Sequence, residues 1–483
     1  MLFNSFPFLV FLPIVFILYW FVFKPLKWQN FFVVVASYIF YGWWNKTFLL
    51  LIAFTTLCSY LFGRLVCSDR KSSKGFAKIY TIANIVINLS ILGVYKYYNF
   101  FVDSFVNAFA SIGVSLHPTS LHLILPVGIS FYTFQALSYT IDVYKGKVEA
   151  TKDVVAFFAF ISFFPQLVAG PIERATNLLP QFQKARTFRY DYAVEGCRQM
   201  LWGFFKKIVI ADNCATYANI AFDDYNECGS HSLILGAFFF TFQIYGDFSG
   251  YSSIAIGCAK LFGISLRANF RVPYFSRDIA EFWRRWHISL NKWFVDYVYI
   301  PLGGSRVSKI KVVRNIFVIF LLSGLWHGAN WTYVSWGLYH ACLFIPLILM
   351  GANKRYVGDF SDRRLPSFHE AVGMITTFIF AVVGWIIFRA ETISDAWGYI
   401  KGIAAIRPNG SAFVSLIETS WLIGVIIFML LVEWYNRNTS YDLQVAPKNK
   451  IIRNAFYVIL IIAVYTSYML SIEDDNIFIY FQF

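Results

Sequence analysis

The sequence predicts an all-α protein that crosses a membrane many times. Of its 483 residues, 58% are hydrophobic and only 14% are charged, and the mean hydropathy is +0.56. Soluble globular proteins carry roughly 25% charged residues, so this chain cannot cover a water-facing surface of normal size. Several apolar runs, clearest at 6–23, 371–390 and 451–470, approach or exceed the ~18 residues that span a bilayer as a helix. They are too long and too uniformly apolar for the alternating strands of a membrane barrel.

Charge and cysteine content argue against several other classes of protein. The net charge of +14 comes from Lys and Arg scattered among short loops, which favours the loop charge of membrane proteins over nucleic-acid binding. The seven cysteines form no CxxC pair, so no zinc or redox motif is visible. Cys214 and Cys228 flank an acidic loop and could pair outside the cell, but we favour the interpretation that they are small membrane-buried residues.

Basic loops orient the first helices. Residues 1–23 hold no Lys or Arg, and "KPLK" follows, so we expect the N-terminus outside. The first run has no basic segment before it and no small-residue cleavage site, which indicates a retained helix and not a signal peptide. Helices at about 30–44 and 47–63 lead to a loop with five Lys or Arg, which we place in the cytoplasm. Helices at 79–96 and 121–141 then go out and return.

The stretch at 153–175 is apolar but broken by Pro165, Gly170 and Pro171, with basic residues on both flanks. This pattern fits a re-entrant segment on the cytoplasmic side, and it equally fits an ordinary kinked helix with its loop. Broken backbone at membrane depth requires surrounding protein or a water-filled cavity.

The second half of the chain predicts a further series of helices. They are expected near 192–211, 232–246, 311–325, 331–350, 371–390, 417–434 and 451–470. Residues 391–416 could add a short interfacial helix. Residues 471–483 lack Lys and Arg, so we expect the C-terminus outside and an even number of crossings, about twelve. No internal repeat is visible, which disfavours an inverted-repeat transporter.

Residues 277–297 predict one continuous amphipathic helix. Its apolar face carries, at i, i+3, i+4 and i+7 spacing, Ile279, Phe282, Trp283, Trp286, Leu290, Trp293 and Phe294. A tryptophan-rich helix with arginines on its other face suits the membrane interface, so we expect it to lie flat on the cytoplasmic side. His287 stands at the border of the two faces, either as a packing residue or as a functional one.

His327 stands in a different setting. Small residues surround it, and no Lys, Arg, Asp or Glu lies between Arg314 and Lys354. A lone ionisable group at that depth is costly, so function or close pairing is the default expectation. A neutral imidazole can take a proton from a hydroxyl, which contributes roughly 10²–10⁴ in rate. A satisfied core histidine is the alternative, and His340 is interpreted as structural.

Asp247 and Ser249 form a third polar cluster, in "GDFSGYS". The spacing is not that of the G-x-S-x-G nucleophile elbow, so a serine-hydrolase interpretation fails. Asp247 could be a proton or cation site of a transporter, or it could orient a tryptophan, histidine or serine in a cavity.

Several enzyme motifs are missing from the sequence. There is no P-loop and no G-x-G-x-x-G. The H-x-x-x-x-D pattern of some lipid acyltransferases would place Asp where Thr332 follows His327. No His, Cys or Glu cluster has metal-ligand spacing.

Five stretches resemble the membrane-bound O-acyltransferase (MBOAT) family, most closely its bacterial branch that includes the alginate O-acetylation protein. They are 127–147, 163–174 ("FFPQLVAGPIER"), 247–264, 269–304 ("NFRVPYFSRDIAEFWRRWHISLNKWFVDYVYIPLGG") and 325–341 ("LWHGANWTYVSWGLYHA"). The terminal "FIYFQF" also resembles that branch. One departure is Ser253, where many relatives are expected to have an acidic residue, which puts local polar contacts in doubt.

The resemblance implies a fold and an activity. The fold would be one membrane domain over 1–483, a ring of tilted helices around a central tunnel, with re-entrant and interfacial helices. Its N-terminal helices would occupy 1–120, its catalytic core 121–350 and its C-terminal helices 351–483. The activity would be O-acyl transfer in the bacterial cytoplasmic membrane, from a cytoplasmic thioester to an extracytoplasmic hydroxyl, with no permanently bound cofactor.

The resemblance also implies roles for individual residues. His327 would be the catalytic general base and His287 would assist it. Substrate or donor contacts, including those that position the acyl group or its oxyanion, would come from Trp286, Arg284, Arg285, Asn330, Trp326, Asp247, Ser249 and Gln166. The donor would be acetyl-CoA or a carrier-protein thioester. In this branch the acyl group commonly passes to an extracytoplasmic partner with a serine–histidine–aspartate site (SGNH type or similar), which modifies a polysaccharide.

Three alternatives stay open at this point. A D-alanyl transferase for teichoic acids would use a carrier-protein thioester. A transporter without chemistry would depend on Asp247 and tolerate His327→Gln. A scaffold for a partner enzyme would need neither His287 nor His327.

Overall fold

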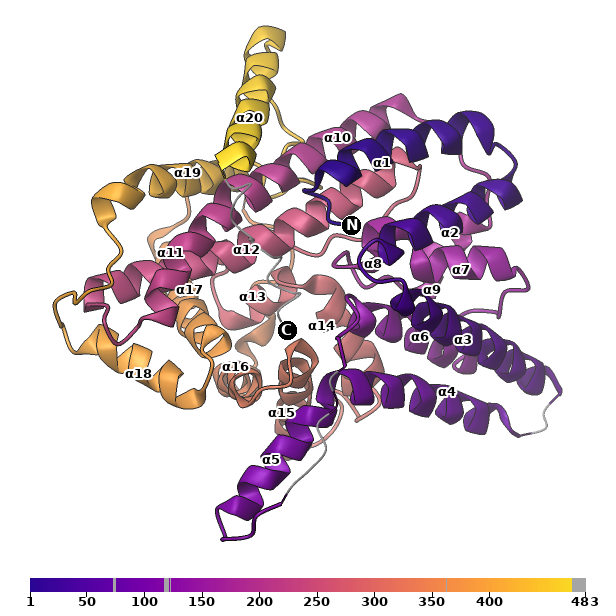
Figure 1. Ribbon diagram of the computed structural model, residues 1–483, viewed down its shortest axis with the longest axis horizontal. Helices are drawn as coiled ribbons and strands as arrows, with labels where there is room; N and C mark the ends of the chain where they lie inside the picture. The colour runs from indigo at the N-terminus through magenta and orange to yellow at the C-terminus, as the bar shows by residue number, and fades with distance from the viewer. Residues whose placement is uncertain (73–74, 117–120, 122, 362, 471–483) are drawn as a thin grey trace. The chain divides into compact units, whose positions relative to one another are not determined.

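The computed structural model describes residues 1–72, 75–116, 121, 123–361 and 363–470, and these residues form helices and loops without a strand (Figure 1). The prediction of an all-helical membrane protein is therefore confirmed. The chain divides into two compact units: unit 1 comprises Met1–Val194 and Cys258–Arg267, and unit 2 comprises Glu195–Gly257 and Ala268–Phe483. The single membrane domain expected from the sequence stays a prediction.

Unit 1 holds the N-terminal helices. They are α1 (Phe6–Ile17), the π-helical turn η1 (Leu18–Val22), α2 (Leu26–Gly42), α3 (Thr47–Ser72), α4 (Ala77–Leu92), η2 (Gly93–Tyr97), α5 (Tyr98–Ala110), α6 (Ile129–Tyr144), α7 (Val154–Ser162), α8 (Phe164–Leu167) and α9 (Ala175–Phe182). The break expected within 153–175 is present, because the backbone leaves the helix at Phe163 between α7 and α8. Re-entry of this segment stays a prediction.

Unit 2 holds the remaining helices, apart from the two ends that lie in unit 1. They are α10 (Tyr190–Phe204), η3 (Phe205–Ala211), α11 (Asp212–Asp223), α12 (Ser230–Leu261), η4 (Pro273–Phe275), α13 (Ile279–Arg285), α14 (Ile288–Phe294), η5 (Val295–Tyr299), α15 (Lys309–His327), α16 (Trp331–Leu349), η6 (Ala352–Lys354), α17 (Phe368–Arg389), α18 (Ile393–Ala404), α19 (Leu416–Tyr435) and α20 (Lys450–Leu470). The helix expected over 232–246 continues to Leu261. The expected position of residues 471–483 falls outside the described residues.

Seven helices in the described part of the chain are long and apolar enough to cross a membrane. They are Thr47–Ser72, Ala77–Ala110, Lys309–His327, Trp331–Leu349, Phe368–Arg389, Leu416–Tyr435 and Lys450–Leu470, and the shorter apolar helix Phe6–Val22 adds to them. The chain is thus polytopic. A ring of about twelve crossings stays a prediction.

Buried polar side chains join the helices of unit 1. Asn84 of α4 donates from Nδ2 to Oγ1 of Thr140 on α6 over 2.9 Å, and Ser59 of α3 donates to Oδ1 of Asn84 over 3.3 Å. Small and amide side chains of this kind hold membrane helices together, because hydrocarbon offers no competing hydrogen bonds. Cys214 and Cys228, in unit 2, are buried and free, in agreement with the favoured interpretation.

The expected continuous helix over 277–297 is wrong. It breaks after Arg285: Trp286 is extended, and His287 has φ 44° and ψ 51°, in the left-handed region. Distant hydrogen bonds cause the break, since Ile288 N donates to Asn269 O over 2.9 Å and Arg271 N donates to Arg285 O over 3.0 Å. Asn291 closes the corner by donating from Nδ2 to the carbonyls of Trp283 and Trp286, over 2.6 and 2.7 Å.

Part of the polar side of this segment is buried whereas Lys292 is exposed, and the expected position at the membrane interface stays a prediction. Glu281 is 1% exposed and Arg285 6% exposed. Ion pairs within unit 2, described below, compensate these charges.

Candidate functional site

Two buried histidines of unit 2 lie close together. The ring centroids of His287 and His327 lie 6.3 Å apart, and the two residues are 1% and 4% exposed. His287 precedes α14 and His327 is the last residue of α15. The structure therefore brings together the two residues that the sequence singles out for catalysis.

His287 is held by a side chain that the sequence analysis missed. Its Nδ1 lies 3.1 Å from Oδ1 of Asn269, which is itself 1% exposed. The same oxygen accepts from the hydroxyl and the backbone N–H of Ser289, over 2.8 and 3.3 Å. A non-glycine residue with positive φ is uncommon and costs free energy, so the surrounding contacts must hold His287 in place.

His327 is held by the close packing of α15 against α16 (Figure 1). A Cβ atom at Gly324 would come within 2.2 Å of the carbonyl oxygen of Tyr333, so only glycine allows the two backbones to approach this closely. After His327 the chain turns through Gly328, and Asn330 caps α16.

Aromatic rings enclose both imidazoles. The His327 ring lies 5.0, 5.2 and 5.4 Å from the rings of Trp326, Trp336 and Phe388. The His287 ring lies 4.6 Å from that of Phe248 and 5.7 Å from that of Trp326. Such a lining excludes water and strengthens electrostatic interactions inside the site.

Burial changes the protonation of His287. Removal from water, with a further contribution from the nearby His327, lowers the pKa of His287 well below its usual 6.5. His287 is therefore neutral at pH 7, and one of its two ring nitrogens is a hydrogen-bond acceptor.

Trp336 was not singled out from the sequence either. It is fully buried beside His327, and its indole Nε1–H has no hydrogen-bond partner among the described residues. A buried donor without a partner in an enclosed site can stabilise a developing negative charge on a bound substrate. Its place in the quoted stretch 325–341 was the available signal.

A cavity of about 570 Å³ is lined by residues of the two segments that carry the histidines. Its lining includes Ile288, which follows His287, and Ser323, which lies one helical turn before His327 on α15. Most of the lining is apolar, and Arg284, Lys292 and Lys354 supply positive charge. The volume and lining suit a ligand with an apolar part and an anionic part.

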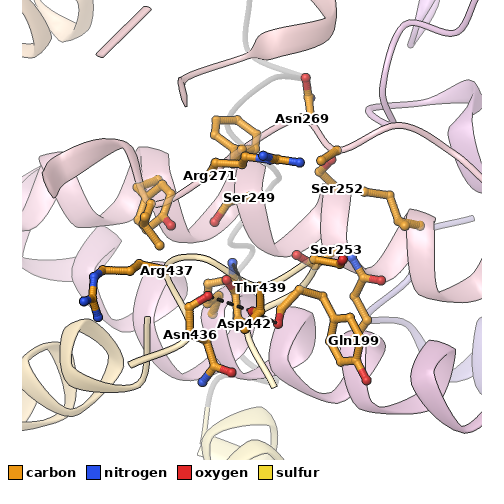
Figure 2. Close-up of a pocket in the computed structure, with 18 residues that line it drawn as sticks. Gln199, Ser249, Ser252, Ser253, Asn269, Arg271, Asn436, Arg437, Thr439 and Asp442 are labelled. Atoms are coloured by element: carbon orange, nitrogen blue, oxygen red, sulfur yellow. Dashed lines mark hydrogen bonds and ion pairs between the residues drawn. The ribbon is translucent and has the colours of Figure 1, made fainter. Parts of the chain in front are cut away.

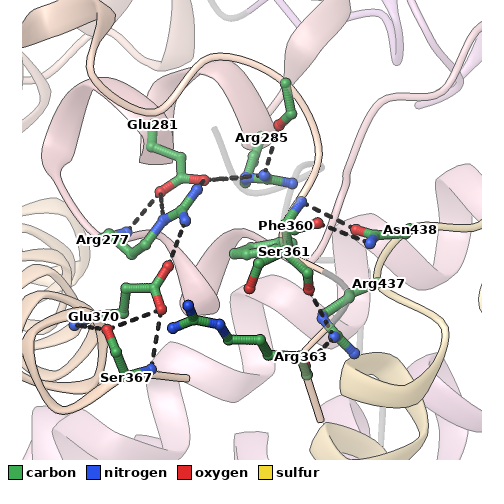
Figure 3. Close-up of polar contacts among 11 residues, drawn as sticks. Arg277, Glu281, Arg285, Phe360, Ser361, Arg363, Ser367, Glu370, Arg437 and Asn438 are labelled. Carbon is green, nitrogen blue, oxygen red and sulfur yellow. Dashed lines mark hydrogen bonds and ion pairs between the residues drawn. The ribbon is translucent and has the colours of Figure 1, made fainter. Parts of the chain in front are cut away.

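The two arginines predicted to hold the donor have different surroundings. Arg284 lines the cavity and donates to the carbonyls of Asn353 and Tyr356, over 2.8 and 2.9 Å. Arg285 instead pairs with Glu281 over 2.9 Å. Figure 3 shows that Glu281 lies between Arg285 and Arg277.

Arg277 completes this network by pairing with Glu370 at the start of α17, over 2.8 Å. Two arginines thus face two glutamates, and the charges balance. The network ties α13 to α17 (Figure 3).

Asp247 lies on α12 in a buried ion pair. Its Oδ1 is 2.7 Å from Nζ of Lys207, which also pairs with Asp212 over 2.8 Å. Lys207 belongs to η3, which packs closely on α12 because Gly203 and Gly250 meet: a Cβ on either would lie 2.7 Å from the other's carbonyl oxygen. The partner of Asp247 is thus a lysine cation.

Ser249 lines a small polar pocket with Asn269, Lys206 and Asp442 (Figure 2). Lys206 pairs in turn with Asp442 over 3.0 Å and Glu433 over 3.6 Å. Ser253, at the departure from the family pattern, lines the same pocket.

The other predicted contact residues lie as follows. Trp286 is buried against Trp385, at 4.8 Å between rings. Asn330 uses its Oδ1 to cap α16 and donates from Nδ2 to the carbonyl of Glu391 over 2.9 Å. Gln166 lies in α8 of unit 1 and donates to Oε1 of Gln135 over 3.0 Å. Their roles in substrate binding stay predictions. No described group of three or more His, Cys, Asp or Glu is placed to hold a metal ion.

Buried ionisable side chains in a polytopic membrane protein mark a functional site, and histidine is the side chain used most often to transfer protons in catalysis. The comparison with known families agrees, because the model of the membrane-bound O-acyltransferase family matches residues 148–389. The chain belongs to this MBOAT family, and it is an O-acyltransferase.

Relatives with described functions fall into three groups. A "Probable alginate O-acetylase AlgI" of Pseudomonas aeruginosa is 42% identical over 82% of this chain and 74% of its own length. A peptidoglycan O-acetyltransferase of Helicobacter pylori is 30% identical, over 93% of this chain and 91% of its own. A teichoic acid D-alanyltransferase of Bacillus subtilis is 32% identical, over 57% of this chain and 72% of its own.

Proposed function

We propose that this protein transfers an acetyl group from a cytoplasmic thioester to an extracytoplasmic hydroxyl, for O-acetylation of a polysaccharide directly or through a partner. The observation that carries the proposal is the buried pair of His287 and His327, with ring centroids 6.3 Å apart. Relatives named for O-acetylation that match over most of this chain support the choice of an acetyl group and a polysaccharide.

The chemistry needs one proton acceptor and a dry site. His327 takes the proton of the acceptor hydroxyl as its oxygen attacks the thioester carbonyl. The C–O bond forms, the C–S bond breaks, and the proton passes from the imidazole to the leaving sulfur. The aromatic rings around His327 limit hydrolysis of the acyl group by keeping water out.

The 570 Å³ cavity is the place for the donor. Its apolar lining suits the acyl chain and pantetheine arm, whereas Lys292 and Lys354 suit the phosphates. The loops that border it carry Arg306, Lys309 and Lys354 with few acidic residues, which is typical of the cytoplasmic side. Acetyl-CoA fits these features, and a carrier-protein thioester shares the same phosphopantetheine chemistry.

The acceptor would come from the opposite side. α15 has its basic residues at its start and His327 at its end, and its 19 residues span about 28 Å. An extracytoplasmic SGNH-type partner, or the polysaccharide itself, would therefore meet the acyl group from outside. The proposed enzyme works in the bacterial cytoplasmic membrane, where a cytoplasmic donor and an extracytoplasmic acceptor lie on opposite sides.

The test uses purified protein in lipid nanodiscs with radiolabelled acetyl-CoA. Release of coenzyme A and transfer of label are compared among wild type, His327→Ala and His287→Ala. His231→Ala is the matched control, because His231 is exposed at the start of α12. We expect turnover to vanish in His327→Ala while donor binding persists, and His231→Ala to behave as wild type.

Two results would change the proposal. Full activity in His327→Ala would remove this histidine from the chemistry. Activity with a D-alanyl carrier-protein thioester and none with acetyl-CoA would favour the D-alanyl transferase, which the Bacillus subtilis relative represents over a smaller part of the chain.

A further inference from the structure

The amide orientation of Asn269 is defined by its neighbours. Its Oδ1 accepts hydrogen bonds from the backbone N–H and the hydroxyl of Ser289. The same oxygen lies 3.1 Å from Nδ1 of His287. A backbone N–H can only donate, so the Asn269 atom that faces it must be the oxygen and not the amide nitrogen.

This orientation decides which ring nitrogen of His287 carries the proton. Because Oδ1 can only accept, Nδ1 of His287 must donate to it, and a neutral imidazole then has Nε2 as its accepting nitrogen. We propose that Asn269 is a positioning residue that holds His287 as the Nδ1–H tautomer, so that Nε2 accepts a proton or hydrogen bond during acyl transfer. A neutral His287 in this state has no second N–H to offer to an oxyanion.

Asn269 also belongs to the lining of the small polar pocket of Figure 2. Its Nδ2 has no hydrogen-bond partner among the described residues, and the same holds for Oγ of Ser249, Oγ of Ser252 and Oε1 of Gln199. All four side chains line this pocket, whose free volume of about 40 Å³ has room for a few water molecules.

An amide flip would turn Nδ2 of Asn269 toward the backbone N–H of Ser289, and two donors would then face each other. The contact with Ser289 thus fixes the orientation of Asn269, and through it the tautomer of His287.

The surroundings of His287 include one titratable side chain that affects its pKa, His327 on α15, whose positive charge would lower that pKa. The other rings against it are uncharged: Phe248 of α12, Phe270 of the preceding loop and Trp326 of α15. A negative charge placed at Asn269 would therefore have a direct effect on the protonation of His287.

The first test measures the tautomer in the wild-type protein and uses one variant only to assign the signals. Full-length protein labelled with ¹⁵N at histidine is studied in nanodiscs by solid-state NMR, and the His287 signals are assigned by their loss in His287→Gln. We expect Nδ1 to be protonated and Nε2 unprotonated at pH 7.5. An Nε2–H tautomer of His287 would overturn the proposal, whether or not the protein transfers acetyl groups.

The second test rests on the proposed acyl transfer and follows its rate against pH. Asn269→Asp keeps an acceptor oxygen but adds a negative charge that favours protonated His287, so the acid limb of kcat should move up by about one to three pH units. Asn269→Leu should lower kcat by about 10- to 100-fold with little change in KM and leave His287 in mixed tautomers. Asn107→Asp, an exposed change of equal charge, is the control.

An active Asn269→Asp variant with the wild-type pH profile would overturn the positioning role. If Asn269→Leu does not fold, the tautomer of His287 in wild type and the pH dependence of kcat in Asn269→Asp still test the positioning role. If wild type shows no acetyl transfer, the proposed function fails, while the tautomer measurement confirms or overturns the role of Asn269.

Discussion

The rings of His287 and His327 lie 6.3 Å apart, one at a left-handed corner before α14 and the other at the last residue of α15. Each is enclosed by aromatic rings, and the lining of the 570 Å³ cavity includes Ile288, next to His287 in the chain, and Ser323, four residues before His327. The proposed donor cavity and the proposed catalytic histidines thus share two segments of the chain.

Replacing both histidines should lower kcat little more than replacing one of them. If His287 and His327 act on the same proton transfer, each single change to Ala lowers kcat by about 10²- to 10⁴-fold, and the double variant falls no further than the more damaged single variant. The double-mutant cycle is measured by coenzyme A release. Strict multiplication of the two effects would show that the histidines act separately.

Trp336→Phe should lower kcat by at least about 10-fold with little change in KM. The ring packing is kept, but the unpartnered Nε1–H beside His327 is lost. Trp397→Phe, on an exposed tryptophan of α18, is the control. An unchanged kcat would mean that the indole donor has only a packing role.

The positive lining of the donor cavity should affect binding and not chemistry. Lys292→Gln with Lys354→Gln is expected to raise KM for acetyl-CoA and to reduce its dependence on salt, because two cations that attract phosphates are removed. Lys401→Gln with Lys448→Gln removes the same two positive charges from exposed residues outside the cavity lining. Equal effects of the cavity and control variants on KM would argue against this donor site.

The cluster of Lys207, Asp212 and Asp247 should support the fold. Lys207→Met leaves two buried carboxylates facing each other and should destabilise the protein by about 3–5 kcal/mol, whereas Asp247→Asn keeps the Lys207–Asp212 pair and should cost less. Thermal unfolding in detergent measures both. A stable Lys207→Met variant would contradict this, and Asp247→Asn that blocks transport of a solute would revive the transporter alternative.

Stability should fall in acid partly through His287. Its folded pKa lies below the usual 6.5, so the unfolded chain binds the proton more readily than the folded one. The contribution is fully present above about pH 6.5 and is lost as the pH falls below that value. Tm measured between pH 7.5 and 5 should therefore drop more in wild type than in His287→Gln. An equal fall of Tm with pH in the two proteins would contradict a lowered pKa of His287.

Much of the fold follows from local pattern. Long apolar runs such as 371–390 and 451–470 became α17 and α20, because a helix in lipid must satisfy its own hydrogen bonds and needs a fixed length to do so. The quoted stretches around His287 and His327 also indicated the family and the proposed catalytic pair. These features depend on neighbours along the chain, which a sequence displays directly.

The tertiary structure decided what depends on distant partners. Periodicity predicted an unbroken helix over 277–297, but backbone hydrogen bonds with Asn269 and Arg271 outweigh the local helical preference and turn the chain at His287. Asp247 looked like a lone acid until helix packing brought Lys207 to it. The sequence by itself determined a helical membrane acyltransferase and its two histidines. Only the folded chain decided that Asn269 contacts His287 and that Lys207 pairs with Asp247, because those contacts join residues that no local pattern relates.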